Sequence, residues 1–556
     1  MKRKFLAITM VAAVLMTGCQ ADQHAESSEN IENAEESFSV EQMNQKMLDK
    51  AGSLPKSNSL YFENGLEITG LGVTYDGRPT AFDGCYYFPA IEALTGAHVA
   101  IDWQEDDGYS SAVATTLLSD KSGLPDILNP TGFGVMDLAD DNLIVPLDDY
   151  MDLMPDIIEA VGEDRMDAWK ASDGHIYTIP SVSTIQGSFS MMIRQDWLKA
   201  LNMEVPKTWD EWLTYWRGVR DRDLNGNGDT TDEVPIALAE SADGERSLTL
   251  LLNAFGIAAS NDTQFCVLED GTYTMVYEHP RYPEFLKAVT GLYEEGILVE
   301  GYEAFSYASI EEMMGNNTLG STMTFAASGA QTETLRQNGI EDALWLSVAP
   351  VMGPYGDQMI PERELVSPVW CITAGADERG KVEDIVRFFN WCYTDEGARL
   401  YNYGIEDVSY TIENDSPVLD KALVADGFED YRAVGINYEP FGGFWLQDAY
   451  MQCLFSGKTR DHLTDIQAET YNGLFVVNNG FYYTQPQTIE SAGYVQYRTS
   501  LITEGVCKLR DRAIRGEISQ EEFWSGYKAL KEKGLNQIIT DGDMYYQSMM
   551  SGGVGE

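Results

Sequence analysis

The feature that most constrains this chain is an alternation of strand-like and helix-like segments that starts near residue 58. Residues 66–73 form a β-rich run, residues 99–103 alternate as a short strand, and residues 111–118 have helical spacing. Such alternation predicts parallel sheets that are covered by helices. Because the chain has 556 residues, more than a single hydrophobic core accommodates, we expect two or more α/β lobes.

Turns that follow the predicted strands are the first candidates for ligand contact. In open α/β sheets, ligands bind beyond the carboxyl ends of the strands. The sequence therefore predicts a ligand site near five residues of these turns: Tyr75, Asp76, Asn129, Thr131 and Phe133.

The first nineteen residues have the pattern of an export signal. Lys2, Arg3 and Lys4 precede an apolar run over residues 5–16, which is too short to span a bilayer and indicates a cleaved signal peptide. The residues before Cys19 resemble the lipobox of bacterial lipoproteins, although Met16 occupies the usual leucine position. We predict lipidation at Cys19, with an ordinary secretory peptide as the alternative. Two or three acyl chains hold a protein firmly on a membrane.

Charge and composition exclude several partners. Residues 20–40 carry six acidic side chains and no Lys or Arg, which predicts a flexible, self-repelling tether that we extend over residues 20–57. The whole chain has 89 acidic and 37 basic residues, a formal net charge of −52. The net negative charge of the whole chain repels the phosphate backbone of nucleic acids, so we expect no nucleic-acid partner.

Cysteine and histidine usage gives no metal or disulfide framework. The five histidines are too scattered for a zinc site. Six cysteines follow Cys19 at wide, irregular spacing, and both buried free thiols and disulfides are compatible with it. These are Cys85, Cys266, Cys371, Cys392, Cys453 and Cys507.

Helix signals are clear further along the chain. Thr208 and Glu211 have the spacing of a capping box, and residues 382–401 have helical apolar spacing. We therefore expect a helix that starts after Thr208 and another over residues 382–401.

Five phrases, in their order and spacing, resemble the extracellular solute-binding proteins of ABC importers, in their long carbohydrate-binding lipoprotein branch. With the signal, they cover most of the chain. The last phrase has Asp407 where the family usually has glycine. The phrases are residues 123–127 (GLPDI), 142–150 (NLIVPLDDY), 173–180 (DGHIYTIP), 194–211 (beginning RQDWL and ending VPKTWDE) and 401–406 (YNYGIE).

The resemblance implies a type II periplasmic-binding-protein-like fold, in which two α/β lobes are joined by a multi-crossover hinge around a ligand cleft. Members of this family close by hinge bending, and the membrane permease recognises the closed form. The resemblance also implies a monomer on the extracellular face of a Gram-positive type of membrane, which delivers an oligosaccharide to an ABC permease. The expected divisions are 1–19 (signal peptide), 20–57 (tether), 58–182 plus 356–408 (first lobe) and 183–355 plus 409–556 (second lobe).

Residues 221–232 fit the calcium loop of EF-hands, with oxygen-bearing side chains at loop positions 1, 3, 5, 9 and 12 and glycine at 6. Position 12 is Asp, so Glu233 is a candidate stand-in. A second register starts at Asp223 but lacks the acid at position 9. Pro235 follows too soon for a regular exiting helix, which favours a structural Ca²⁺ clamp over a sensor; a metal-free surface turn is the alternative. The predicted ligands are Asp221, Asp223, Asn225, Asn227, Asp229 and Asp232.

Aromatic side chains stack on sugar rings, and the chain has 30 tyrosines and 11 tryptophans, most of which must be core. We favour those beside turns, such as Trp445 near two glycines. Trp103 is less favoured, because a role as a cap of its strand also explains it. The predicted ligand contacts are Tyr75, Asp76, Phe133, Gln186, Trp370 and Trp445.

A secreted glycoside hydrolase is the main competing class. Glycoside hydrolysis needs two carboxylates at a defined separation, and no pair stands out among the acidic residues, so we predict that the protein is not an enzyme. Two further classes compete with a sugar receptor: a binding protein for a non-sugar solute such as a peptide, and a calcium-dependent surface scaffold.

Overall fold

The chain divides into two units, Met1–Phe38 and Ser39–Glu556, and every described residue lies in the second. The structure is a computed structural model. It describes residues 40–550 except 75–84, 106–108, 110–111, 114, 117–120, 132–133, 163–164, 172, 185–188, 240–247, 260–263, 326–328, 363–364, 425–433, 437–440, 442, 459, 484–493 and 495–496.

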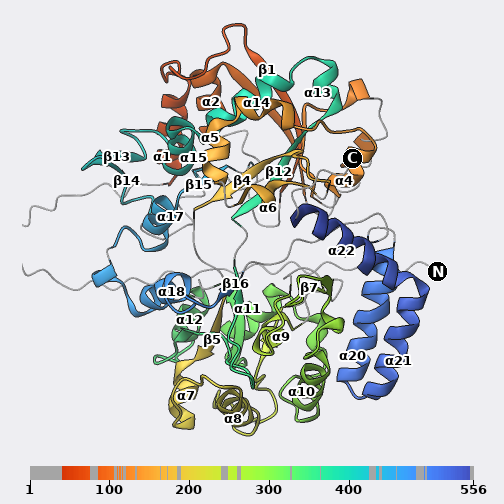
Figure 1. Ribbon diagram of the computed structural model, residues 1–556. Helices are drawn as coiled ribbons and strands as arrows, with labels where there is room; N and C mark the ends of the chain where they lie inside the picture. Colours follow the sequence, from red (N-terminus) through yellow and green to blue (C-terminus); the bar gives the residue numbers. More distant parts are fainter. Residues whose placement is uncertain are drawn as a thin grey trace, which may run out of the picture. The chain divides into compact units, whose positions relative to one another are not determined.

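Ser39–Glu556 contains two larger sheets, each with its own helices (Figure 1). The first sheet has six strands in the order β15-β4-β12-β3-β1-β2. Strand β12 runs antiparallel to both β3 and β4, while the other neighbouring strands are parallel. The sheet is therefore mixed, whereas the sequence pattern predicts a parallel one. The strands are β1 (Leu66–Thr74), β2 (Ala97–Glu105), β3 (Ile127–Leu128), β4 (Thr178–Ser183), β12 (Val366–Ile372) and β15 (Phe444–Trp445).

Helices from distant parts of the chain pack on this first sheet or on one another beside it. Strand β15 and the helix after it belong here, although we placed them after the lobe boundary at residue 409. The helices are α1 (Val40–Ala51), α2 (Tyr87–Thr95), α4 (Val135–Asp140), α5 (Pro155–Val161), α6 (Met166–Trp169), α13 (Ala374–Glu378), α14 (Val382–Tyr393), α15 (Asp395–Tyr403) and α17 (Gln447–Leu454).

The second sheet has four strands in the order β10-β5-β9-β6. A large apolar cluster that runs from Met191 to Ile538 covers it, and a second cluster contains Met192 and Trp345. Its strands are β5 (Phe189–Arg194), β6 (Ala237–Leu238), β9 (Ser321–Phe325) and β10 (Trp345–Val348). Its helices are α7 (Gln195–Leu201), α8 (Trp209–Arg220), α9 (Thr249–Ala254), α10 (Tyr282–Glu294), α11 (Tyr307–Gly315), α12 (Gly329–Gln337), α18 (Asp465–Phe475), α20 (Lys508–Ile514), α21 (Gln520–Leu530) and α22 (Asn536–Met550).

The structure also describes three two-stranded pairs and two π-helical segments. The pairs are β7 (Phe265–Val267) with β8 (Tyr273–Met275), β11 (Ile360–Pro361) with β16 (Tyr482–Tyr483), and β13 (Tyr410–Glu413) with β14 (Ser416–Leu419). The π-helical segments are Arg498–Cys507 and Lys531–Leu535.

Local sequence signals explain where several helices begin. The predicted capping box is confirmed: Glu211 N donates to Thr208 Oγ1 and Thr208 N donates to Glu211 Oε2 at the start of α8. The expected helix over residues 382–401 is instead two helices, α14 and α15, because Thr394 leaves the helical conformation and its Oγ1 caps Gly397 N. A Cβ at Gly397 would lie 2.3 Å from Trp391 O, so only glycine fits this corner.

The segment predicted as a tether overlaps helix α1. Met43 and Met47 of α1 lie four residues apart on one face and are almost fully buried, and the helix contacts α2. The apolar spacing of these methionines therefore outweighs the acidic composition that precedes them. The ends of the tether and the lobes stay predictions.

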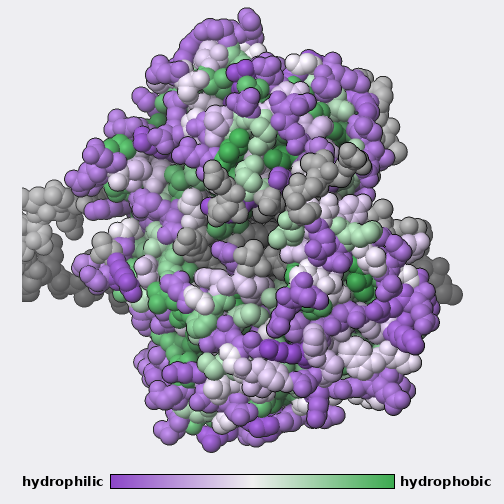
Figure 2. Space-filling model, in the orientation of Figure 1, coloured by the Kyte–Doolittle hydropathy of each residue, from purple (hydrophilic) through white to green (hydrophobic). Residues whose placement is uncertain are grey.

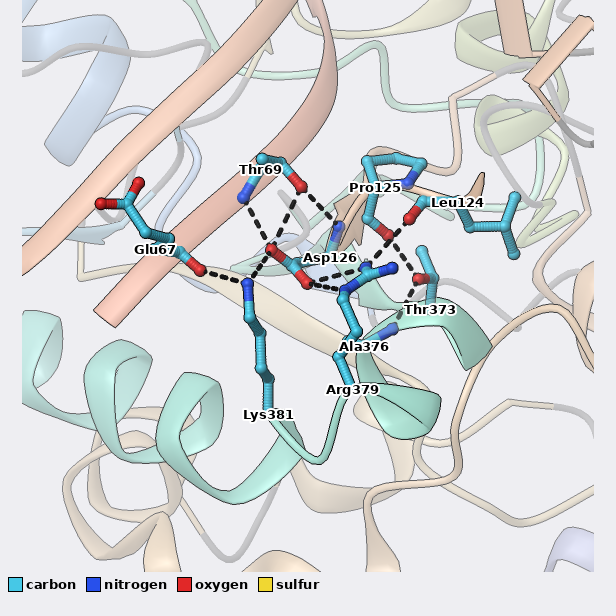
Figure 3. A network of polar contacts seen from close by, with 9 residues as sticks. All are labelled: Glu67, Thr69, Leu124, Pro125, Asp126, Thr373, Ala376, Arg379 and Lys381. Carbon is cyan, nitrogen blue, oxygen red and sulfur yellow. Dashed lines mark hydrogen bonds and ion pairs between the residues drawn. The ribbon is translucent and has the colours of Figure 1, made fainter. Parts of the chain in front are cut away.

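Asp126, in the GLPDI phrase, ties together three segments of the first sheet (Figure 3). Its fully buried carboxylate accepts hydrogen bonds from Thr69 N and Oγ1, from Arg379 Nε and Nη2, and from Lys381 Nζ. Burial by itself raises the pKa of Asp126, but the hydrogen bonds from Thr69, Lys381 and Arg379 outweigh it and lower the pKa below its ordinary value. This phrase is therefore structural, joining β1 to the turn before β3 and to the α13–α14 corner.

Candidate ligand-binding site and calcium loop

The carboxyl ends of β1, β3, β4 and β15 share one edge of the six-stranded sheet, because these strands are all parallel to one another. Among the described residues, the predicted Asn129 and Thr131 lie just after β3 at this edge. Asn129 follows β3 and is buried, and its Oδ1 accepts a hydrogen bond from Thr131 N, which shapes the turn. This edge is the candidate ligand-binding site.

Strand β4 is also where the chain leaves the first sheet for β5 of the second sheet. At its end, Ser183 N donates to Leu365 O, on the segment that returns from the second sheet to β12. On its other side, Val182 N donates to Gly443 O and Thr184 N donates to Trp445 O. Three passes of the chain therefore meet at the end of β4, as the predicted hinge requires.

The two tryptophans predicted as ligand contacts, Trp370 and Trp445, differ in their burial. Trp370 is 1% exposed, and its indole N–H donates to Phe441 O at 2.7 Å. Its ring packs against Trp103 and Phe441, with centroids 6.0 Å apart in both pairs. In this conformation Trp370 is a core residue, because it points into the sheet's packing and its polar atom is already paired.

Trp445, in contrast, is partly exposed at the end of β15. Its ring meets the Tyr401 ring edge to face at 6.1 Å and packs against the small cluster of Tyr450 and Leu474. Trp103, which we favoured less, is also partly exposed and covers buried Trp370. Trp103 lies within β2, and its ring covers Gly72, where a Cβ would lie 2.5 Å from it.

The calcium-like loop is fully described, and hydrogen bonds within the loop hold several of its side-chain oxygens. Asp223 accepts from Gly226 N and Gly228 N, at 2.7 and 2.9 Å. Asp232 accepts from the side-chain amides of Asn225 and Asn227. Among the described residues, no three His, Cys, Asp or Glu side chains lie close enough together to hold a metal ion.

Two acidic side chains at the ends of this loop, Asp221 and Glu233, have different surroundings. Asp221 is exposed and paired with Arg220 Nε at 2.7 Å, which holds the pKa of Asp221 below its ordinary value. Glu233 is 6% exposed; its Oε1 accepts from Leu224 N and Asn225 N, whereas its Oε2 is buried with no hydrogen-bond partner. An unpaired buried carboxylate oxygen is costly, and a bound cation would satisfy it. The unpaired Oε2 of Glu233 is therefore the one observation in this loop that fits a cation.

Comparisons with known proteins find that this chain is similar to solute-binding proteins. No family model matches the chain. The fructooligosaccharide ABC transporter substrate-binding protein FusA of Streptococcus pneumoniae is 32% identical over 233 residues, which span 39% of this chain and 41% of FusA. Lipoprotein LipO of Bacillus subtilis is 19% identical over 83% of this chain and 88% of LipO. The chain is a relative of ABC-transporter substrate-binding proteins.

Solved structures of solute-binding proteins share the fold over most of both chains. A human-milk-oligosaccharide (HMO)-binding protein of Bifidobacterium longum infantis has a TM-score of 0.70 at 16% identity, covering 88% of this chain and 99% of that one. Alginate-binding protein AlgQ2, solved without calcium ion, has a TM-score of 0.65 at 20% identity, covering 88% and 100%. FusA in complex with kestose has a TM-score of 0.63 at 19% identity with the same coverage, and a FusA EF-hand mutant has also been solved. The predicted type II periplasmic-binding-protein-like fold is confirmed.

Several predicted site residues lie outside the described part of this relative of the solute-binding proteins. They are Cys19, Tyr75, Asp76, Phe133 and Gln186. The roles of these residues, and of Trp370 and Trp445, stay predictions. Within the described residues, no helix is both long and apolar enough to cross a membrane. Hydrophilic residues cover most of the coloured surface in Figure 2, in keeping with the large excess of acidic residues.

All six cysteines after Cys19 are described, and all are buried free thiols. Burial raises the pKa of the Cys266 and Cys371 thiols to about 12. For a soluble variant that begins at residue 20, we expect a thiol reagent such as DTNB to label no cysteine in the native protein at pH 8. After unfolding in guanidinium it should label six, and fewer than six would reveal a disulfide.

Proposed function

We propose that this protein is the substrate-binding component of an ABC importer and that it captures an oligosaccharide outside the cell. The observation that carries the proposal is the similarity to FusA, which is named for fructooligosaccharide binding, together with the shared fold. FusA is named as a binding protein and not as an enzyme, which supports a non-catalytic role here. A permease partner, a monomeric state and lipid anchoring at Cys19 belong to the same proposal.

Calorimetry against a panel of oligosaccharides, including fructooligosaccharides, tests this function. We expect stoichiometric binding of at least one glycan and no products in the same samples. Turnover without stoichiometric binding would favour the glycoside hydrolase, and tight binding of peptides alone would overturn the sugar part.

Trp445 is the described side chain that we expect to stack on the sugar, because it combines partial exposure with a position where the three chain passes meet. Replacing Trp445 by Ala should cost about 2 kcal/mol of binding, roughly thirtyfold in Kd. Calorimetry with the selected glycan checks this. Trp524→Ala is the matched control, since Trp524 is a partly buried tryptophan on α21 that packs against the apolar cluster of the second sheet. An equal loss in both variants would contradict the assignment.

We further propose that the loop binds a structural Ca²⁺ in the register that begins at Asp223, with Asn225, Asn227, Asp232 and Glu233 as side-chain ligands. Supporting this register are the unpaired Oε2 of Glu233 and the engagement of Asp221 with Arg220. Calcium would hold the end of α8 to the segment that leads into β6.

Adding calcium to the chelated protein should raise the free energy of unfolding, by about 2.7 kcal/mol at a free concentration one hundred times Kd. Glu233→Gln keeps the acceptor for Leu224 N and Asn225 N but loses a charged ligand, so it should abolish most of this gain. Asp221→Asn is the matched control and should keep the gain. Thermal unfolding with and without chelator measures this gain in stability. If Asp221→Asn loses the gain and Glu233→Gln keeps it, the register that begins at Asp221 is the correct one.

A further inference from the structure

Asn402 is a buried amide on α15 that bonds to the backbone on both sides of Trp445. It is 0% exposed. Its Nδ2 donates to Phe444 O at 2.6 Å and to Ala398 O at 2.8 Å, and its Oδ1 accepts from Leu446 N at 3.0 Å. The amide thus takes the place of a neighbouring strand for the residues before and after Trp445.

The other edge of the same segment is held by Thr184, the residue after β4. Thr184 N and Oγ1 donate to Trp445 O at 2.9 and 3.1 Å, and Oγ1 accepts from Gln447 N at 2.9 Å. Strand β15 has only two residues, which is short for a stable strand. Its position is therefore set by these side chains as well as by the sheet.

Helix α15 also supplies the wall beside the Trp445 ring. Tyr401, the neighbour of Asn402, meets that ring edge to face. Gly443 has φ 152°, and a Cβ there would lie 3.2 Å from the Tyr401 ring. The helix therefore fixes both the backbone and the ring surroundings of Trp445.

We propose that Asn402 is a positioning residue that holds the partly exposed Trp445 ring in place for the ligand, so that little ordering remains to be done on binding. The role of Trp445 as a sugar contact rests on the proposed function, whereas its immobilisation by Asn402 does not. Ordering a flexible side chain at a binding site opposes binding, so a site that is ordered in advance binds more tightly.

Gln452 offers a matched control, because it makes the same kind of clamp elsewhere. Its Nε2 donates to Pro417 O at 3.0 Å and its Oε1 accepts from Leu419 N at 2.9 Å, on strand β14. If both amides have only a structural role, Asn402→Ala and Gln452→Ala should affect the Trp445 resonance and ligand affinity to a similar extent. If Asn402 positions Trp445, only Asn402→Ala should change the Trp445 resonance and weaken ligand binding.

The first experiment needs no ligand. The full chain after the signal is labelled with 5-fluorotryptophan, and the ¹⁹F resonance of Trp445 among the 11 tryptophans is assigned by its loss in Trp445→Phe. Asn402→Ala should broaden or split this resonance, and Gln452→Ala should leave it sharp. If Asn402→Ala does not fold, Asn402→Asp serves instead, because it keeps the acceptor for Leu446 N and loses the donor to Phe444 O. An unchanged Trp445 resonance in the Asn402 variants overturns the proposal.

The second experiment measures affinity for the glycan selected by calorimetry. Asn402→Ala should weaken binding roughly tenfold, and Gln452→Ala by less than twofold. In a Trp445→Ala background, Asn402→Ala should weaken ligand binding by less than a further twofold, because Asn402 affects binding only through the Trp445 ring. Additive losses overturn the positioning role. If the wild type binds no glycan while the ¹⁹F result holds, the positioning of Trp445 stands and the proposed sugar function falls.

Discussion

Replacing Asp126 by Asn should lower the free energy of unfolding by about 3 kcal/mol, since it leaves two cations around a fully buried site without their counter-charge. The Arg379 and Lys381 side chains are 31% and 25% exposed, so solvent partly stabilises the two charges once their partner is lost. We therefore expect a loss of unfolding free energy at the lower end of the range for broken buried ion pairs. Denaturant unfolding measures the loss. The matched control is Glu383→Gln on α14, whose pair with Arg387 is largely exposed and should contribute less than about 0.5 kcal/mol.

This loss should also depend on pH. The folded-state pKa of Asp126 lies below its ordinary value, so its contribution is present above the unfolded pKa of about 3.9 and disappears as the pH falls through the folded value. The wild type and Asp126→Asn should therefore differ fully at pH 7 and converge in strong acid. A difference that grows on acidification would contradict this account.

Replacing Asp511 by Asn should have an effect of similar or larger size, about 3–5 kcal/mol. Asp511 accepts from Arg510 Nε at 2.9 Å and from Tyr302 Oη at 3.1 Å, and the Arg510 and Asp511 side chains are 1% and 3% exposed. The substitution removes the carboxylate charge that pairs with the buried Arg510 guanidinium in the core of the second sheet's helices. Urea unfolding monitored by far-UV circular dichroism checks the prediction.

Two comparisons separate this charge effect from a general sensitivity of α20. Glu517→Gln removes a carboxylate that is 47% exposed and pairs with Arg515, so it should change stability by less than about 0.5 kcal/mol. The double variant Arg510→Met/Asp511→Leu should recover a large part of the loss, because it removes both buried charges together. A double variant less stable than Asp511→Asn would show that the pair itself stabilises the fold.

Local chemistry was predictable from the sequence where it depends on near neighbours. The capping box of α8 formed as predicted, because both of its partners lie within four residues. The alternation of strands and helices indicated sheets covered by helices, and the chain length indicated two or more lobes. The split of residues 382–401 into α14 and α15 was missed, since it depends on the close approach of Gly397 to Trp391 O, which spacing does not reveal.

The candidate site was only partly predictable. Sequence pattern placed both Trp370 and Trp445 beside turns, but the fold buries the first against Trp103 and Phe441 and leaves the second partly exposed. Asn402 gave no sequence signal as a clamp, because its partners Phe444 and Leu446 lie more than forty residues away. In the calcium-like loop, the spacing indicated the oxygens, while burial of Glu233 and the pairing of Asp221 favoured one register.

By itself, the sequence determined the α/β class and the oxygen-rich loop, because both follow from residue types at short spacing. It also carries the export-signal and lipobox pattern before Cys19. Only the tertiary structure decided the antiparallel course of β12, the entry of β15 into the first sheet and the reduced state of six buried cysteines. Those features depend on which distant segments meet, and a chain's local pattern does not specify long-range pairing when many segments have similar apolar faces.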